Sequence, residues 1–327
     1  MDQALEVFLA VVENRGFSRA AEVLHISQPA VSQQIQKFER DLGVTLLERT
    51  SKSFRLTKAG DLVYEHGVAI RRLYEGMQQG IHDLLGSPSG PISIGASYTY
   101  GEYVLPAQLA EFLREYPGVE PSIRISNTTD IVERVEDGRL DIGVVEGEVH
   151  SEVVVPTPLF ADEMVVITGL MHPLVARRHV SSDEQDLADA ITLPETSVLA
   201  PDSLANLSQH VWIVREKGSG TRDMTDAFFA EEGIVPTHLM AVSSTQAIKE
   251  SVMAGLGITL LSEWAVRNEL QWGLVKSIIH PKLPRRRHFT MIRPKSNFAT
   301  MATRKFAEFL GKVGDGHPSV PSMHPPS

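Results

Sequence analysis

The chain has 327 residues, 42% hydrophobic and 22% charged, which is enough for two or three globular domains and excludes a wholly disordered protein. It contains no cysteine, so disulfides, thiolate nucleophiles and cysteine zinc sites are excluded. The net charge of −10 is uneven, because residues 15–58 carry eight Lys/Arg against four Asp/Glu, a balance of +4, which leaves −14 elsewhere. A basic segment in an acidic chain predicts one local surface for a polyanion.

The sequence also bears on location. The longest nearly apolar stretch, residues 252–261, is about half the length of a membrane-spanning helix. The N-terminus has neither the basic start nor the cleavage site of a signal peptide. We therefore expect a cytoplasmic protein without a membrane segment.

Residues 1–58 predict a helix-turn-helix with a β-wing. Apolar spacing indicates a first helix over residues 2–14, while Ser18 and Ser27 are suited to cap the next two helices. The third helix should end at Gly43, and the apolar residues that it should bury are Val31, Ile35, Phe38 and Leu42. Two short strands, over residues 46–49 and 54–57, would form the wing.

The exposed face of the third helix carries side chains suited to DNA. A recognition helix presents its N-terminal half to base edges in the major groove. The residues expected to contact DNA are Ser27, Gln28, Pro29, Ser32, Gln33, Lys37, Arg40, Arg49, Lys52 and Ser53. The alternative is a solvated polar face, against which the basic segment and the wing both argue.

A long helix should follow over residues 59–86. The apolar residues expected on its dimerisation face are Val63, Ile70, Leu73, Met77 and Leu84. About 28 helical residues extend about 42 Å, too far for one small domain to cover this stripe. We expect the stripe to pair with a second copy of the chain. The alternative is a helix that lies on its own second domain.

Strands and helices alternate from residue 87 to 311, which predicts a doubly wound, parallel α/β sheet. The alternation restarts near residue 211, so two lobes with a cleft between them are expected. Residues 87–161 plus 268–311 would form one lobe and residues 162–267 the other. The tail over residues 312–327 is rich in Gly, Pro and Ser and is expected to be flexible.

Polar residues gather at the predicted carboxyl ends of the strands, where ligands bind in open α/β sheets. Over residues 218–222, helix N–H groups, two hydroxyls and a guanidinium would converge on an anion. The candidate effector-binding residues are Ser97, Thr99, Tyr100, Asn127, Thr128, Glu146, Gly218, Ser219, Gly220, Thr221, Arg222, Ser244 and Thr245. The alternative is that they only form turns and helix caps.

The first 60 residues, especially FSRAAEVLHISQPAVSQQIQKFERDLGVTLLER and RLTKAG, resemble the winged helix-turn-helix of the LysR-type transcriptional regulators. The resemblance extends to about residue 310. It implies a DNA-binding domain, a dimerising linker helix and an effector-binding domain of the type 2 periplasmic-binding-protein kind. It also implies a homodimer or homotetramer on promoter DNA, with RNA polymerase as a further partner. Gln33 departs from the basic residue that many members carry, which leaves the contact there and the base preference open.

The C-terminal segment resembles that of regulators concerned with carbon dioxide fixation, cyanate and sulfur compounds, which implies a small inorganic or carboxylate anion as effector. No cofactor, metal or enzyme activity is expected, because the histidines form no HExxH pair and no G-x-S-x-G elbow is present. The run Arg285, Arg286 and Arg287 is predicted to be a solvated turn. The sequence therefore predicts a sequence-specific transcriptional regulator. The alternative is a small-anion solute-binding protein or an enzyme on the same two-lobed fold, and residues 1–85 argue against both.

Overall fold

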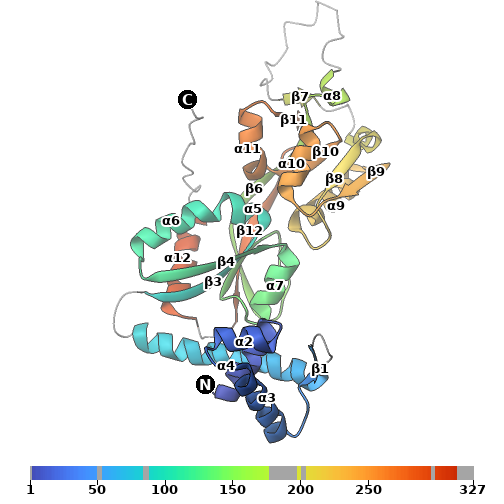
Figure 1. Cartoon of the computed structure of the whole chain (residues 1–327). Coiled ribbons are helices and arrows are strands. Elements are labelled where there is room, and N and C mark those ends of the chain that lie inside the picture. Colours follow the sequence, from blue (N-terminus) through green and yellow to red (C-terminus); the bar gives the residue numbers. More distant parts are fainter. Residues whose placement is uncertain are drawn as a thin grey trace, which may run out of the picture. The chain divides into compact units, whose positions relative to one another are not determined.

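The computed structural model describes residues 2–49, 54–83, 88–176, 197–199, 204–295 and 299–314. The chain forms two compact units, one made mainly of residues 1–88 and the other mainly of residues 89–295 and 302–314 (Figure 1). No helix of the described residues is long and apolar enough to cross a membrane.

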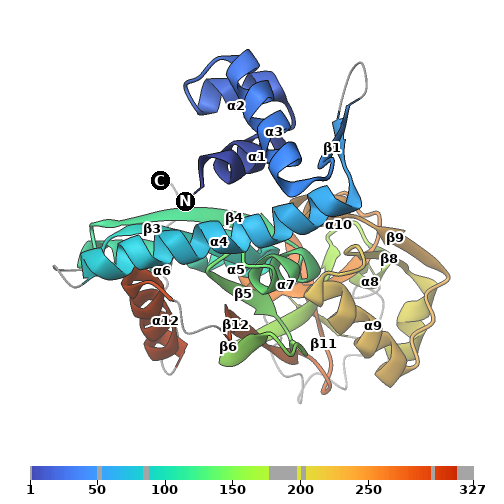
Figure 2. The same cartoon turned by 90° about the horizontal axis from the view of Figure 1, so that it is seen from below.

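The first unit is a winged helix-turn-helix that continues into one long helix (Figure 2). Its elements are α1 (Gln3–Glu13), α2 (Phe17–Val23), α3 (Gln28–Leu42), β1 (Leu47–Arg49), β2 (Phe54–Leu56) and α4 (Lys58–Asp83). Phe8, Leu9, Val31 and Ile35 are fully buried at its centre. The strands β1 and β2 pair antiparallel, so the predicted helix-turn-helix and wing are confirmed.

Local sequence explains the ends of these helices. The backbone N–H of Ala30 donates to the Ser27 Oγ at 3.4 Å, which caps α3 as predicted, and Gly43 ends the helix in the left-handed conformation with φ of 70°. Two predictions are wrong. Gly16 rather than Ser18 precedes α2, and Leu42 is 46% exposed because it lies outside the apolar cluster of this unit.

The helix α4 has a covered beginning and an apolar exposed stripe beyond it. Val63 is half-buried and packs against the core of the winged domain, and its place in the dimerisation stripe stays a prediction. A Cβ on Gly67 would meet Leu5 Cδ1 at 2.9 Å, which shows how closely α1 and α4 approach. Large apolar residues are exposed at helical spacing farther along, namely Ile70, Leu73, Tyr74, Met77 and Ile81. Leu84 lies outside the described residues.

The second unit is a two-lobed α/β domain. Its strands are β3 (Gly90–Ser97), β4 (Val119–Ser126), β5 (Ile142–Glu146), β6 (Val154–Gly169), β7 (Ser197–Leu199), β8 (Val211–Val214), β9 (His238–Ala241), β10 (Ile258–Ser262), β11 (Val275–Ile279) and β12 (Arg285–Pro294). Its helices are α5 (Tyr98–Tyr103), α6 (Leu105–Glu115), α7 (Thr128–Glu136), α8 (Pro173–Ala176), the 3-10 helix η2 (Leu204–Gln209), α9 (Gly220–Glu232), α10 (Thr245–Met253), α11 (Glu263–Gln271) and α12 (Met301–Gly314).

Among the described residues, ten strands form one sheet in which the order β4-β3-β5-β12-β6-β10-β8-β9 runs from one lobe to the other. Within each lobe the neighbouring strands β4-β3-β5 and β10-β8-β9 are parallel. The long strands β6 and β12 pair antiparallel with each other and pass between the lobes (Figure 1). The prediction of an all-parallel sheet is therefore wrong, because both strands that connect the lobes run against their neighbours.

The predicted return to the first lobe at residue 268 is also too early. Val275 lies in one apolar cluster with Ile213 and Ile248 of the second lobe, and Leu270 packs against that cluster. The strand β11 pairs with β6 and β7, so the chain returns only with β12. The first lobe has its own cluster around Tyr100, Phe112, Phe289 and Phe306.

Candidate functional site

The polar face of α3 is exposed in the winged domain. Ser27, Gln28 and Pro29 are exposed at its N-terminal end, and Ser32 is half-buried. Gln33, Lys37 and Arg40 lie around one surface hollow together with Ala30, Gln34 and Gln36. Arg49 ends β1, whereas Lys52 and Ser53 lie outside the described residues.

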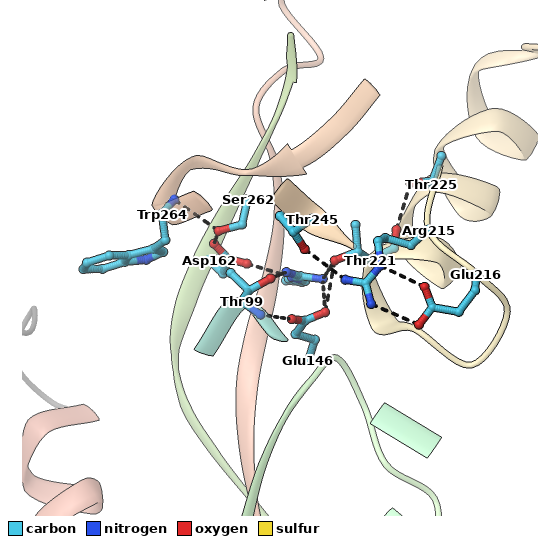
Figure 3. Close-up of polar contacts among 11 residues, drawn as sticks. Thr99, Glu146, Asp162, Arg215, Glu216, Thr221, Thr225, Thr245, Ser262 and Trp264 are labelled. Atoms are coloured by element: carbon cyan, nitrogen blue, oxygen red, sulfur yellow. Dashed lines mark hydrogen bonds and ion pairs between the residues drawn. The ribbon is translucent and has the colours of Figure 1, made fainter. Parts of the chain in front are cut away.

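In the second unit, the lobes meet at a buried ion pair network around Arg287, which we call the Arg287 cluster. Figure 3 labels Glu146, Asp162 and Thr221 of this network. Arg287 Nη1 lies 3.0 Å from Glu146 Oε2, and Arg287 Nε lies 2.7 Å from Asp162 Oδ2. These three side chains are at most 2% exposed. Because isolated buried charges are costly, this cluster depends on all three groups being present together.

Two threonines complete the cluster from the beginnings of helices. Thr221 Oγ1 at the start of α9 donates to Glu146 Oε2 at 3.0 Å and accepts from Arg287 Nη1 at 3.1 Å. The backbone N–H of Thr99 in α5 donates to Glu146 Oε1 at 3.0 Å. Since Thr221 belongs to the second lobe and Thr99 to the first, Glu146 accepts hydrogen bonds from both.

The surroundings of the two carboxylates shift their pKa values in opposite directions. Burial alone would raise the pKa of Glu146, but the charge of Arg287 and the hydrogen bonds from Thr99 outweigh it and lower that pKa. Burial dominates at Asp162 and raises its pKa, although Arg287 and Ser262 oppose the shift. The lowered pKa favours the ionised form of Glu146, which acts here as a counterion of Arg287, and its contact with an effector stays a prediction.

The solvated turn predicted for the three consecutive arginines is wrong. They begin strand β12, where side chains alternate between faces, and Arg287 shares the buried face with Phe289 and Met291. Arg286 is the exposed member and pairs with Glu163 at 2.9 Å. The four residues 289–292 are all buried, so a simple alternation in the sequence does not identify Arg287.

A second buried arginine, Arg215, was not predicted either. It follows β8, its side chain is 1% exposed, and its guanidinium carbon lies 4.5 Å from the centre of the Tyr98 ring. Its Nη1 donates to Thr245 Oγ1 at 3.1 Å, and its Nε lies 2.9 Å from Glu216 Oε2 (Figure 3). Arg215 thereby contacts one residue at the start of α5 and another at the start of α10.

Three of the candidate effector-binding residues have buried hydroxyls without partners. Ser97 and Ser219 are each 1% exposed, and within the described part of the chain neither hydroxyl has a hydrogen-bond partner. The hydroxyl of Thr128, at the start of α7, is buried and unpartnered in the same sense. Buried hydroxyls without partners are uncommon in proteins and are typical of a site that a ligand or water completes.

Glycines allow the loop before α9 to approach the first lobe. Gly218 has a φ of 85°, which side chains rarely adopt, and its carbonyl accepts from the backbone N–H of Thr129 at 3.2 Å. A Cβ on Gly220 would lie 2.6 Å from the carbonyl oxygen of Glu146. The two lobes are therefore in direct contact at Gly220.

Other candidates serve the fold. Arg222 turns to Asp226 at 2.8 Å and to the Arg215 carbonyl at 3.2 Å, and its role beside an anion stays a prediction. Tyr100 is buried in the aromatic cluster of the first lobe, 5.2 Å from the Phe289 ring centre, and its contact with a ligand stays a prediction. Asn127 and Ser244 accept hydrogen bonds from backbone N–H groups at the starts of α7 and α10.

No group of three or more metal-ligating side chains occurs within the described residues. The candidate site consists of two buried guanidiniums, their carboxylates, and hydroxyls at the starts of helices. Side chains of these kinds can bind and orient a small ligand, and they offer hydrogen-bond donors to an anion.

Comparison with known proteins agrees with both units. Residues 3–61 match the family described as "Bacterial regulatory helix-turn-helix protein, lysR family", and residues 85–199 and 193–315 match "LysR substrate binding domain". The HTH-type transcriptional regulator CysL of Bacillus subtilis is 34% identical over 81% of this chain and 82% of its own length. The HTH-type transcriptional activator CmpR of Synechocystis is 31% identical over 93% of each chain.

Solved structures show the same fold. Full-length CbnR complexed with its target DNA is similar with a TM-score of 0.67, 21% identity and coverage of 95% of this chain and 99% of that one. The regulatory domain of Synechocystis CcmR in complex with 2-PG has a TM-score of 0.56 and 23% identity, and the match covers 70% of this chain and 99% of that one. The chain belongs to the LysR family of bacterial regulators, and it is a DNA-binding transcriptional regulator with an effector-binding domain.

Proposed function

We propose that this regulator is controlled by a small oxyanion bound between the two lobes, near Arg215, Ser97 and Ser219. The observation that carries the proposal is the buried Arg215 guanidinium together with two buried, unpartnered hydroxyls, that of Ser97 directly before the Tyr98 ring that Arg215 contacts and that of Ser219 in the loop that follows Glu216. The N-termini of α9 and α10 lie next to Ser219 and Thr245 and add a favourable potential for negative charge. The regulatory domain of CcmR, which has the same fold, was solved in complex with 2-PG, and this is consistent with a small ligand of the effector-binding domain.

The same proposal covers assembly and location. The chain acts in the cytoplasm as a homodimer through the exposed stripe of α4, and two dimers join as a homotetramer on promoter DNA. A ligand changes promoter binding only if it prefers one arrangement of the lobes or subunits over another. Contact with RNA polymerase would then follow from that arrangement. The stripe of five exposed apolar residues supports the dimer.

A thermal-shift screen of small anions on the full chain tests the effector. A ligand at a hundred times its dissociation constant should add about 2.7 kcal/mol to the free energy of unfolding. The same ligand should change retardation of the DNA upstream of the protein's own coding region. An anion that stabilises the protein without altering DNA binding would contradict its role as effector.

The rival function is a solute-binding protein or an enzyme on the same two-lobed fold. The relatives CysL and CmpR are named as transcriptional regulators, which favours regulation. A gel shift distinguishes the two functions. Folded protein that fails to retard any upstream DNA at low salt would favour the rival.

A further inference from the structure

Arg215 and Glu216 form an ion pair within a single loop. The Arg215 Nε and Nη2 atoms donate to the two carboxylate oxygens of Glu216 at 2.9 and 3.0 Å. The Arg215 side chain is 1% exposed, whereas the Glu216 side chain is 27% exposed. A buried guanidinium therefore has a counterion that reaches solvent.

This arrangement differs from the Arg287 cluster. Glu146 and Asp162 are buried and lie on the strands β5 and β6, so neither can leave Arg287 without movement of a strand. Glu216 follows β8 in the loop before α9 and can turn into water by rotation of its own side chain. Of these three carboxylates, Glu216 is the one that can be exchanged.

The position that Glu216 fills is suited to an oxyanion. Two adjacent guanidinium N–H groups match the two oxygens of a carboxylate or phosphoryl group. Arg215 is held from both lobes, by the Tyr98 ring at 4.5 Å and by Thr245 Oγ1 at 3.1 Å. The hydroxyls of Ser97 and Ser219 lack hydrogen-bond partners among the described residues. Ser97 directly precedes Tyr98 in the chain, and the Ser219 backbone N–H lies 3.4 Å from the Glu216 carbonyl oxygen.

We propose that Glu216 occupies the anion position of Arg215 when no effector is bound, and that an oxyanion of the effector displaces it. The inference rests on the effector site proposed above, and it adds that Glu216 neutralises Arg215 in this site when no effector is bound. A buried guanidinium without a counterion is strongly unfavourable, so Arg215 keeps Glu216 until another anion replaces it. Neutral ligands make this exchange poorly, because Arg215 would lose its hydrogen-bonded carboxylate and keep only the longer-range charges of Glu102 and Glu146.

The exchange also keeps the charge near Arg215 constant. One negative group leaves for water as another arrives, so the guanidinium is paired in both states. Glu216 thereby competes with every anion and lowers its apparent affinity. This competition makes the site selective for ligands that offer more than one charged group, because the hydroxyls of Ser97 and Ser219 can donate hydrogen bonds to additional oxygens.

The test measures the dissociation constants of the full-length protein for acetate and for inorganic phosphate, by calorimetric titration at constant ionic strength. Glu216→Gln keeps the shape and removes the competing charge, so we expect about three- to tenfold tighter binding. The matched control is Glu120→Gln, which removes the same charge from an exposed position on β4 and should stay within about twofold of wild type. The anion that gains more identifies the group, carboxylate or phosphoryl, that the site prefers.

Two further variants keep the test decisive. Glu216→Asp shortens the side chain but keeps its charge, so it should give a smaller gain even if Glu216→Gln folds poorly. Arg215→Gln should lose anion binding while its circular dichroism shows a folded chain. Equal responses of Arg215→Gln and wild type would place the anion elsewhere and overturn the proposal.

The proposal and the effector site fail in different ways. If wild type binds an anion saturably but both Glu216 variants bind it with unchanged affinity, the displacement is wrong while the effector site stands. If no variant binds either anion while gel retardation of DNA is intact, the anionic effector itself is wrong as well. In either case the DNA-binding assay shows independently that the protein is active.

Discussion

Glu146 and Arg287 are separated by 141 residues in the chain, yet their side chains form a 3.0 Å ion pair in which each is 2% exposed. The same carboxylate oxygen of Glu146 accepts from Thr221 of the second lobe. One carboxylate thus ties together β5, β12 and the start of α9. This link makes the interface between the lobes sensitive to the loss of any single partner.

Replacing Arg287 with methionine should destabilise the effector-binding domain strongly. The change leaves Glu146 and Asp162 buried without their cation, which costs about 3–5 kcal/mol in comparable cases. Urea unfolding followed by tryptophan fluorescence measures it, because all three tryptophans lie in this domain. The control Arg286→Met removes a side chain that is 71% exposed and should cost less than about 1 kcal/mol. Equal losses in the two variants would show that the buried network adds nothing.

Acid should destabilise the protein partly through His172. Burial and the neighbouring His210 lower the pKa of His172 from 6.5 to about 4. The unfolded chain then binds a proton at this residue more readily than the folded one, so stability falls as the pH drops from 6.5 towards 4. His172→Gln should flatten the pH dependence of the unfolding free energy in this window. His150→Gln, in which the original side chain is 89% exposed, should leave the slope unchanged, and a reversed result would contradict the assignment.

Lys37 and Gln33 should affect DNA binding differently. Lys37→Gln removes a phosphate-binding charge, so affinity should fall for all sequences and the salt dependence should become shallower by about one counterion. Gln33→Ala removes a group expected to contact base edges and should cost roughly 1–3 kcal/mol on the matched site only. Fluorescence anisotropy with matched and scrambled DNA over a range of salt concentrations checks both. Uniform weakening by Gln33→Ala would exclude a role in base recognition.

Charges on the exposed stripe of α4 should break the dimer. Ile70 and Leu73 are 49% and 50% exposed, so their replacement by glutamate leaves the winged domain intact while it opposes pairing of the stripe. Sedimentation analysis should show a loss of oligomers, and specific DNA affinity should fall because a single winged domain contacts half a site. Glu65→Lys changes the charge on another face of the same helix and serves as control. An unchanged sedimentation profile for the double variant would assign assembly to another surface.

Much of the fold followed from periodicity, because amphipathic spacing depends on local sequence alone. The helix-turn-helix, the capping role of Ser27 and the end of α3 at Gly43 are local features of this kind. The antiparallel course of β6 and β12 could not be read in the same way. Their pairing joins residues such as Arg287 and Asp162 that are 125 positions apart, and no local pattern encodes it.

The sequence predicted the polar residues in turns at the ends of strands, and it missed the buried charged residues of the candidate site. Thr99, Ser219 and Thr221 stood out because small polar residues follow strands there. Arg215 and Arg287 were missed because an arginine in a sequence is first taken to be solvated, and its burial depends on distant carboxylates. Arg222 was chosen for its place at a helix start, but its side chain turned to Asp226 four residues along the same helix.

The strand β12 also decides when the effector-binding domain can fold during synthesis. Its residues 289–292 pair with residues 143–146 of β5, so one edge of β5 has no partner strand until about 150 further residues have been made. The second lobe is synthesised in that interval, while this edge of β5 stays unpaired. A nascent chain stalled before residue 285 would therefore expose an unpaired strand edge, which is the kind of surface that chaperones bind and that aggregation begins from.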